Sequence, residues 1–387
     1  MISNIAILGA GFVGASLAVG LSKLGFQVTV IEKREPSAGP ESFGVDVRSV
    51  AISPASRSYL ESLDIWPQTL SEPYFKLSIW ENRGISDLEF DSAELRLENL
   101  GWIVEASKYQ ASIWEKLDSF GVVKLLGSPS DLSLSEHGVD IGFADRRESF
   151  DLLIGADGVN SFVRRALSLP MKKTSTGQFA LATIIRSERD HNGCALQRFL
   201  EEGPVAALPS KEKNVRTIIW SQNEKTVKAK MEQSDQALNS DLEAVFGERV
   251  GRIEEIGKRF MFPLAQQRVK DFMPERRVIM IGDAARTIHP LAGFGANLGF
   301  EDARELIEVA RLTRLEDPKA LLKYAKRREA RSDFMIFLME TILGAYTRNS
   351  PFLSWLRNVA VGFVDENAWI KNQIVKEASG YGPASRF

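Results

Sequence analysis

Cysteine and histidine are scarce in this chain, and neither supports a disulfide or a metal centre. One of the 387 residues is cysteine and three are histidine. Cys194 cannot form an internal disulfide, so we expect a reducing compartment and a cytoplasmic protein. No set of His, Cys and carboxylate residues has the spacing of metal ligands, and we expect no bound metal.

A strong charge of one sign and long apolar runs are missing as well. The net charge of −2 gives no electrostatic reason to expect a nucleic-acid partner. No apolar run reaches the roughly 20 residues that span a bilayer. Because Met1-Ile-Ser-Asn leads directly into an apolar strand, we expect no signal or transit peptide. A chain of this length predicts two or three subdomains.

The first informative segment is a glycine-rich turn near the N-terminus. Ile5-Ala-Ile-Leu-Gly9-Ala-Gly11-Phe-Val-Gly14 reads as an apolar strand, a tight turn and a helix. Gly9 permits the turn, Gly11 lets the backbone approach a pyrophosphate, and Gly14 lets the helix pack on the strand. Glu32 follows the next predicted strand and is placed to accept from both hydroxyls of a ribose, which favours FAD or NAD over NADP.

Two later segments also end a buried strand in a polar turn, as ligand-binding α/β sheets do. They are Asp151-Leu-Leu-Ile-Gly155-Ala-Asp157-Gly158 and Val278-Ile-Met-Ile-Gly282-Asp283, which continues through Arg286 to Gly299. Asp283 is placed to accept from a ribityl hydroxyl. Pro290, Gly293 and Gly295 form a loop that can lie against a flat ring, and Asn297-Leu298 would open a helix whose positive end faces that ring. The third segment therefore favours FAD over NAD.

These motifs resemble the ubiquinone-biosynthesis hydroxylases, which are flavin-dependent aromatic hydroxylases with the p-hydroxybenzoate hydroxylase fold. The resemblance covers nearly the whole chain in the same order. Besides the glycine turn and the third motif, it is carried by Asp46–Ser53, Gly101–Glu105, Gly155–Arg164, Gln197–Phe199, Phe262–Leu264, Tyr324 and Arg331. Three departures are Arg286 where the family commonly has His, Phe294 where it has Gln, and Ala106-Ser107 where it has Asn-Arg.

By this resemblance, Glu32, Arg48, Gln110 and Asp283 are expected to contact FAD. Asp157 and Gly158 would contact the pyrophosphate region and a transient nicotinamide cofactor. No second Rossmann turn follows a strand, so NAD(P)H is expected to bind only transiently in a groove. The implied reaction is hydroxylation of an aromatic ring by O₂ through a flavin C4a-hydroperoxide.

The expected fold class is α/β, with a Rossmann-like FAD-binding domain, an inserted β-sheet substrate domain and C-terminal helices. We assign residues 1–73, 100–176 and 274–320 to the FAD-binding domain. The substrate domain would comprise residues 74–99 and 177–273, where short β-like runs such as Arg216–Trp220 occur. Residues 321–387 would form a helical region.

A base that removes the proton of a phenol would aid the reaction, but the sequence identifies none firmly. His289 lies in the predicted flavin loop and is a weak catalytic candidate. His137 and His191 lie in turns of polar composition and are expected at the surface.

The C-terminal region bears on the substrate. The apolar segments Phe334–Leu343 and Phe352–Phe363, the second with Trp355 and Arg357, are most simply ordinary helical core. They could instead cover the entrance for a prenyl tail or rest on a membrane surface. The basic run from Lys323 to Arg331 is most simply a solvated helix face.

The sequence thus predicts an FAD-dependent monooxygenase that hydroxylates a prenylated phenol of ubiquinone biosynthesis, using NAD(P)H and O₂. One alternative is a hydroxylase of a small aromatic acid, in which Arg198 or Arg216 could bind the carboxylate. Another is a flavin-carrying structural subunit of a biosynthetic complex. Contact with the inner face of a membrane, with other biosynthetic enzymes or with a second copy of the chain would suit the first reading.

Overall fold

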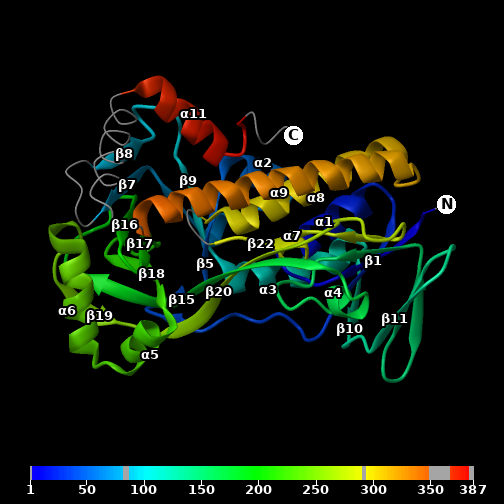
Figure 1. Cartoon of the computed structure of the whole chain (residues 1–387), viewed down its shortest axis with the longest axis horizontal. Helices are drawn as coiled ribbons and strands as arrows, with labels where there is room; N and C mark the ends of the chain where they lie inside the picture. The colour runs from blue at the N-terminus through cyan, green and yellow to red at the C-terminus, as the bar shows by residue number, and fades with distance from the viewer. Residues whose placement is uncertain (1, 82–86, 290–292, 348–366, 383–387) are drawn as a thin grey trace.

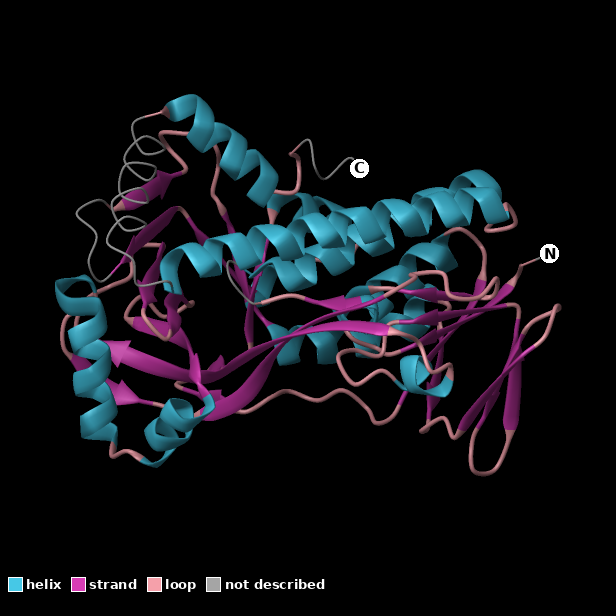
Figure 2. Cartoon of the chain, viewed as in Figure 1, coloured by secondary structure: helices cyan, strands magenta, loops and turns pink. Residues whose placement is uncertain are grey.

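The computed structural model of the chain describes residues 2–81, 87–289, 293–347 and 367–382. Two sheets lie at opposite ends of the long axis, and the helices α8 (Phe294–Thr313) and α9 (Pro318–Thr347) run along that axis beside both of them (Figures 1 and 2). The predicted α/β fold class is confirmed.

The first sheet has five parallel strands, and its strand order places the three predicted motifs next to one another. The order is β10-β2-β1-β14-β21. Its strands β1, β14 and β21 are nearly all apolar and buried, as is typical of parallel strands covered on both faces. The strands are β1 (Asn4–Leu8), β2 (Gln27–Glu32), β10 (Val123–Leu126), β14 (Leu152–Gly155) and β21 (Val278–Met280).

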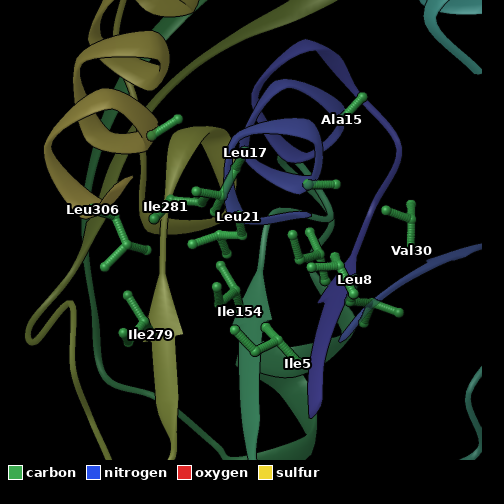
Figure 3. Packing of buried hydrophobic residues seen from close by; sticks show 14 of the residues in the cluster. Ile5, Leu8, Ala15, Leu17, Leu21, Val30, Ile154, Ile279, Ile281 and Leu306 are labelled. Atoms are coloured by element: carbon green, nitrogen blue, oxygen red, sulfur yellow. The ribbon is translucent and has the colours of Figure 1, made fainter. Parts of the chain in front are cut away.

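The helices α1 (Phe12–Lys23) and α8 pack together on this sheet. A Cβ atom on Gly20 of α1 would lie 2.1 Å from Ile307 Cδ1 of α8, so the two helices meet through a glycine. Each fully buried Leu or Ile in this layer contributes roughly 1.5–3 kcal/mol to stability. Figure 3 shows the layer, which includes Ile5, Leu17, Leu21, Ile154, Ile279 and Leu306.

Smaller elements surround the parallel sheet. Two three-stranded sheets and a two-stranded one have the orders β11-β12-β13, β5-β9-β6 and β3-β4. The strands are β3 (Glu41–Ser42), β4 (Val45–Asp46), β5 (Ser49–Ile52), β6 (Ser71–Tyr74), β9 (Gly101–Glu105), β11 (Asp131–Leu134), β12 (Val139–Gly142) and β13 (Arg147–Phe150). The helices are α2 (Pro54–Ser62), α3 (Ala106–Lys116), α4 (Phe162–Ala166) and the short α7 (Gly282–Ala285).

The second sheet has nine strands and is largely antiparallel. Its order is β22-β20-β15-β18-β17-β16-β7-β8, with β19 paired to β15 and with β16 and β7 parallel. The helices α5 (Glu224–Glu232) and α6 (Asp235–Phe246) cover one of its faces. The strands are β7 (Lys76–Glu81), β8 (Leu88–Asp91), β15 (Met171–Ser187), β16 (Cys194–Leu200), β17 (Gly203–Pro209), β18 (Val215–Asn223), β19 (Ile253–Ile256), β20 (Phe260–Val269) and β22 (Arg286–Thr287).

The nine-stranded sheet extends past the expected limits of the substrate domain at both ends. β15 begins at Met171, six residues before the expected boundary at 177, and β22 comes from the third motif. β15 is one continuous strand of 17 residues, so no loop separates the two regions at that point. The expected boundary at 177 therefore lies inside β15, a strand of the nine-stranded sheet.

The basic run on α9 was predicted to be solvated, and this prediction is wrong for two of its arginines. Arg328 and Arg331 are buried, with 0% and 2% exposure. Arg328 Nε donates to Asp302 Oδ1 at 2.7 Å and its Nη2 to Glu301 Oε2 at 3.0 Å. Carboxylates on α8 compensate the buried charge, and composition alone does not reveal such partners.

The same network reaches the last helix, α11 (Ala368–Ala378). Arg331 Nε donates to Glu301 at 3.2 Å, and Arg331 Nη1 donates to Glu377 on α11. Ion pairs thus fasten α9 to α8 and α11 to α9.

The segment Phe334–Leu343 was expected to be core, and it is so on one side only. Met335 and Met339 are buried against Phe199, Ile288 and Leu298. Phe334 and Phe337 are 44% and 66% exposed. The companion segment Phe352–Phe363 lies outside the described residues. Among the residues that the structure describes, no helix is long and apolar enough to cross a membrane.

The buried network gives a testable difference between neighbouring arginines. Arg328→Met removes a cation from three carboxylates and should lower the free energy of unfolding by roughly 3–5 kcal/mol. Arg327→Met removes a half-exposed partner of Glu305 and should cost about 1 kcal/mol or less. Urea unfolding of both variants measures the difference, and equal losses would contradict the account of the network.

Candidate active site

The three motifs meet at the carboxyl edge of the parallel sheet. Leu8 pairs with Gly155, and Gly155 pairs with Met280. The ladder continues into the turns, since Ala156 N donates to Leu8 O at 2.8 Å and Ile281 N to Gly155 O at 2.9 Å. The turns that follow β1, β14 and β21 are therefore immediate neighbours.

The glycines of the first turn meet different steric demands. Gly9 has φ +107°, and a Cβ atom there would lie 2.4 Å from Ala156 O. A Cβ atom on Gly14 would lie 2.0 Å from Gly9 O, so only glycine allows α1 to start this close to the strand. A Cβ atom on Gly11 would meet nothing within 4 Å. Space thus remains at Gly11 for another group to approach the backbone.

Glu32 and Gln110 converge on the residue between the first two glycines. Glu32 Oε2 accepts from Ala10 N at 2.7 Å, and Gln110 Nε2 donates to Ala10 O at 3.2 Å. Two of the expected FAD contacts therefore lie at the glycine turn, although they are far apart in sequence.

Arg48 is placed next to this group but has an exposed side chain. Its carbonyl accepts from Ala106 N at 2.8 Å, at the start of the helix that carries Gln110. Its N–H donates to Asp46 Oδ1 at 2.9 Å. The backbone of Arg48 is fixed, and the guanidinium extends towards solvent.

Asp157 of the second motif caps a helix. Its Oδ2 accepts from the N–H groups of Phe162 and Val163 at 2.6 and 3.3 Å, at the start of α4. Burial raises the pKa of this carboxyl, although the same N–H groups oppose the rise. Asp157 therefore shapes the turn at Gly158, which has φ +74°.

Arg164 joins the second motif to the third, a role that sequence reasoning missed. Its Nη1 donates to the carbonyl oxygens of Asp283 and Ala284 at 3.0 and 2.9 Å, and to that of Gly158 at 3.3 Å. The spacing of this arginine within the motif was visible in the sequence, but its target is a backbone that only the fold brings near.

Asp283 stands at the start of α7, and it is exposed between buried neighbours. Desolvation raises the pKa of its carboxyl, while the positive charges of Arg286 and Arg164 oppose the rise. A carboxylate so placed can accept hydrogen bonds from a hydroxyl-bearing ligand at the sheet edge.

The helix expected to open at Asn297 begins earlier, at Phe294. Gly293, with φ +67°, is its N-cap residue. Asn297 Nδ2 donates to Ala51 O and Gly293 O, both at 2.9 Å, and its Oδ1 accepts from Ser53 N at 2.9 Å. Asn297 thus binds the loop to β5 from within the helix rather than opening it.

The remaining residues of the third motif differ in their surroundings. A Cβ atom on Gly295 would meet nothing within 4 Å, and Leu298 is buried among apolar residues of α9. Pro290 lies outside the described residues.

The arrangement fits a dinucleotide. No side chain among the described residues caps α1 or α8, and neither helix has an acid in its first turn. Uncapped helix N-termini favour negative charge, as on a pyrophosphate or on an electron-rich ring carbonyl. Glu32 and Asp283 supply acceptors for hydroxyl groups on either side.

Comparisons with known proteins agree with this site. A family model described as FAD binding domain matches residues 144–336, and another described as FAD dependent oxidoreductase matches residues 4–122. The 3-demethoxyubiquinol 3-hydroxylase of Escherichia coli is 31% identical over 98% of both chains. The ubiquinone hydroxylase UbiL of Rhodospirillum rubrum is 27% identical over 98% of this chain and 90% of its own.

The chain belongs to the ubiquinone-biosynthesis hydroxylases, a family of FAD-dependent monooxygenases. Solved structures confirm the fold. The p-nitrophenol 4-monooxygenase of Pseudomonas putida has a TM-score of 0.77 at 17% identity, covering 99% of each chain. The FAD complex of HpxO from Klebsiella pneumoniae has a TM-score of 0.75 at 20% identity, covering 98% of this chain and 99% of its own.

His289 of this hydroxylase is buried and hydrogen-bonded, which makes it a poor general base. Its Nε2 lies 3.0 Å from Gln178 Oε1 on β15. Burial lowers its pKa to about 4, so the ring is neutral at pH 7 and accepts a proton only weakly.

The other two histidines differ in their exposure to solvent. His137 is exposed, as predicted. His191 was expected at the surface but is buried, because Ser210 O and Gly193 N hold its ring at 2.8 and 3.0 Å. Among the described residues no group of His, Cys and carboxylates could hold a metal ion.

The glycines of the first turn give a test that separates folding from FAD binding. Gly11→Ala should change the stability of the apoprotein by less than about 1 kcal/mol. It should weaken FAD by about tenfold or more, because the methyl group occupies the approach to the backbone. Gly14→Ala should instead lower stability by roughly 3 kcal/mol or more.

Thermal unfolding of the apoprotein and fluorescence titration with FAD measure the two quantities separately. Undiminished FAD affinity in Gly11→Ala would contradict the placement of the pyrophosphate.

The buried state of His289 predicts a pH dependence of stability. Its pKa is about 4 in the folded chain and near 6.5 in the unfolded chain, so the unfolded state binds the proton first as pH falls. Proton binding to the unfolded state lowers the free energy of unfolding. The contribution of the neutral, buried ring to stability is therefore fully present above pH 6.5 and is lost as the pH falls from 6.5 to 4. Between pH 7 and 4.5 the free energy of unfolding should therefore fall by roughly 2–3 kcal/mol less in His289→Gln than in the wild type.

Urea unfolding at the two pH values measures this difference. His137→Gln, at an exposed turn, is the matched control and should keep the wild-type loss. If the free energy of unfolding of His289→Gln fell as much between pH 7 and 4.5 as that of the wild type, this pH dependence could not be assigned to His289.

Proposed function

We propose that this hydroxylase transfers one oxygen atom of O₂ to the ring of a prenylated phenol or quinol precursor of ubiquinone. The names of its relatives support this substrate class, since the relative from E. coli is a 3-demethoxyubiquinol 3-hydroxylase. The observation that carries the proposal is the polarity of the two faces of the nine-stranded sheet.

Arg198 and Arg216 point to the face that α5 and α6 cover. Arg198 Nη1 donates to the carbonyls of Ala244 and Val245 at the end of α6. Arg216 Nη1 donates to Ser187 Oγ and Arg189 O, both at 2.8 Å, and is 2% exposed. The guanidinium groups of both arginines therefore form hydrogen bonds within the sheet domain. This argues against a small aromatic acid as substrate, because such an acid was expected to bind one of them through its carboxylate.

The opposite face is directed at the parallel-sheet region. Thr217 Oγ1 on this face lies 3.2 Å from Ser49 Oγ of β5. Beside Thr217 are Ala206, Leu208 and Ile219, which are apolar and partly exposed. No residue that alternation places on this face is charged within 203–209 or 215–221. An apolar, uncharged surface suits a prenylated ring better than a carboxylate.

We further propose how the chain holds FAD. The N-terminus of α1 at Gly11 would bind the pyrophosphate, Glu32 the ribose hydroxyls and Asp283 a ribityl hydroxyl. Arg48, Gln110, Asp157 and Gly158 would line the same path. FAD held by these residues would supply the redox chemistry, in which NAD(P)H is the reductant and O₂ the source of the oxygen atom.

The residues of the chain would orient the flavin and supply an electrostatic field that suits its negative charge. The N-terminus of α8, preceded by Gly293 and followed by Gly295, would stabilise negative charge on the ring carbonyl of the flavin. Asn297 would hold the loop in place through its bonds to β5. The packed apolar face of the sheet would exclude water from the reacting ring.

A membrane-embedded substrate would require contact with the bilayer, and we propose such peripheral contact as part of this function. Phe337 on α9 and Trp369 on α11, which are 66% and 70% exposed, support it. Aromatic side chains of this kind are favoured at membrane interfaces.

The substrate class is tested by mass spectrometry of the quinone lipids in cells that lack this gene. A prenylated phenol or quinol short of one oxygen atom should accumulate, and a plasmid copy of the gene should reverse this. A plasmid carrying Asp283→Ala serves as the negative control and should not reverse the accumulation. An unchanged quinone profile would refute the substrate class and leave the flavin site standing.

A further inference from the structure

A buried carboxylate of α8 binds the turn that carries Asp283. Asp302, with 0% exposure, accepts from Gly282 N through Oδ2 at 2.9 Å. Its Oδ1 accepts from Arg328 Nε at 2.7 Å. The carboxylate is thus fully engaged within the protein.

Arg286 completes the arrangement from the other side of the turn. Its Nη1 donates to Asp302 Oδ2 and lies 3.4 Å from Gly282 O. The ion pair therefore engages both polar groups of Gly282, the N–H through Asp302 and the carbonyl through Arg286. Gly282 has φ +56°, a conformation that needs such support to present the next residue in one direction.

We propose that Arg286 and Asp302 are positioning residues for the flavin, which as an ion pair clamp Gly282 and so fix where Asp283 presents its carboxylate. The inference rests on the proposed contact between Asp283 and FAD. It assigns a role to Arg286, a position at which the chain departs from the pattern of its family.

The pair also acts on the charge of Asp283. The charged groups around that carboxyl are Arg286 and Arg164, which favour its ionised form, and Asp302, which opposes it. Loss of the Arg286 charge should raise the pKa of Asp283 beyond the rise that burial causes. FAD affinity should then begin to fall at a higher pH as the solution is acidified, because a protonated carboxyl is a weaker acceptor.

The experiment is titration of the apoprotein with FAD between pH 5 and 8. R286Q should weaken FAD by about tenfold or more at pH 7. FAD affinity is expected to fall at acid pH, and we call this part of the pH profile the acid limb. R286Q should also move the acid limb to a higher pH, by about half a pH unit or more. R286K keeps the charge, so it should weaken FAD less and leave the acid limb in place. D283N should remove the limb.

E377Q is the matched control, because it removes a charge from the far end of the same buried network. It should lower the unfolding temperature without changing the FAD affinity or its pH limb. Equal changes in FAD affinity for R286Q and E377Q would overturn the proposal, since both would then act through stability alone.

An acid limb that persists in D283N would also overturn the proposal. If R286Q does not fold, R286K carries the test, and an unchanged FAD affinity in that variant would refute the clamp. The substrate class is measured independently by the quinone lipids, so failure of the two proposals can be told apart.

Discussion

The site depends on one constraint, which is that the carboxyl ends of β1, β14 and β21 lie side by side. The strand order of the parallel sheet imposes it, and the buried apolar layer beneath α1 and α8 maintains it. Gly14 must approach Gly9 closely for α1 to start at that edge. The turns then converge, and backbone N–H groups, two carboxylates and two helix N-termini face one region. In the proposed binding mode FAD would contact all three turns at once, which requires this convergence.

Much of this was predictable from local patterns. The glycine turn, Glu32 and the strands before Asp157 and Asp283 each carry a short-range signal, since an apolar run followed by a specific polar turn has few structural meanings. Their convergence follows from the rule that parallel strands present ligands at their carboxyl ends. The position of Gln110 beside Ala10 could be expected only from the resemblance, because no local pattern connects residues so far apart.

Two of the errors share a physical cause, which is that burial of a polar residue depends on partners distant in sequence. Arg328 and Arg331 lie in a run that composition describes as solvated, yet the acids Glu301 and Asp302 on α8 neutralise them. His191 is buried because a carbonyl and an amide satisfy its ring. The start of α8 was misplaced because Asn297 resembles an N-cap residue, whereas its side chain bonds back to Gly293 and across to β5.

The central claim is that the chain hydroxylates a prenylated ring and not a small aromatic acid, and isotope transfer tests it most directly. Purified protein with FAD, NADH and ¹⁸O₂ would be given a short-chain prenylated phenol in detergent micelles or, separately, p-hydroxybenzoate. The account predicts a prenylated product that carries one ¹⁸O atom on its ring, and only uncoupled hydrogen peroxide with the acid. A labelled product from the acid, with none from the prenylated phenol, would contradict it.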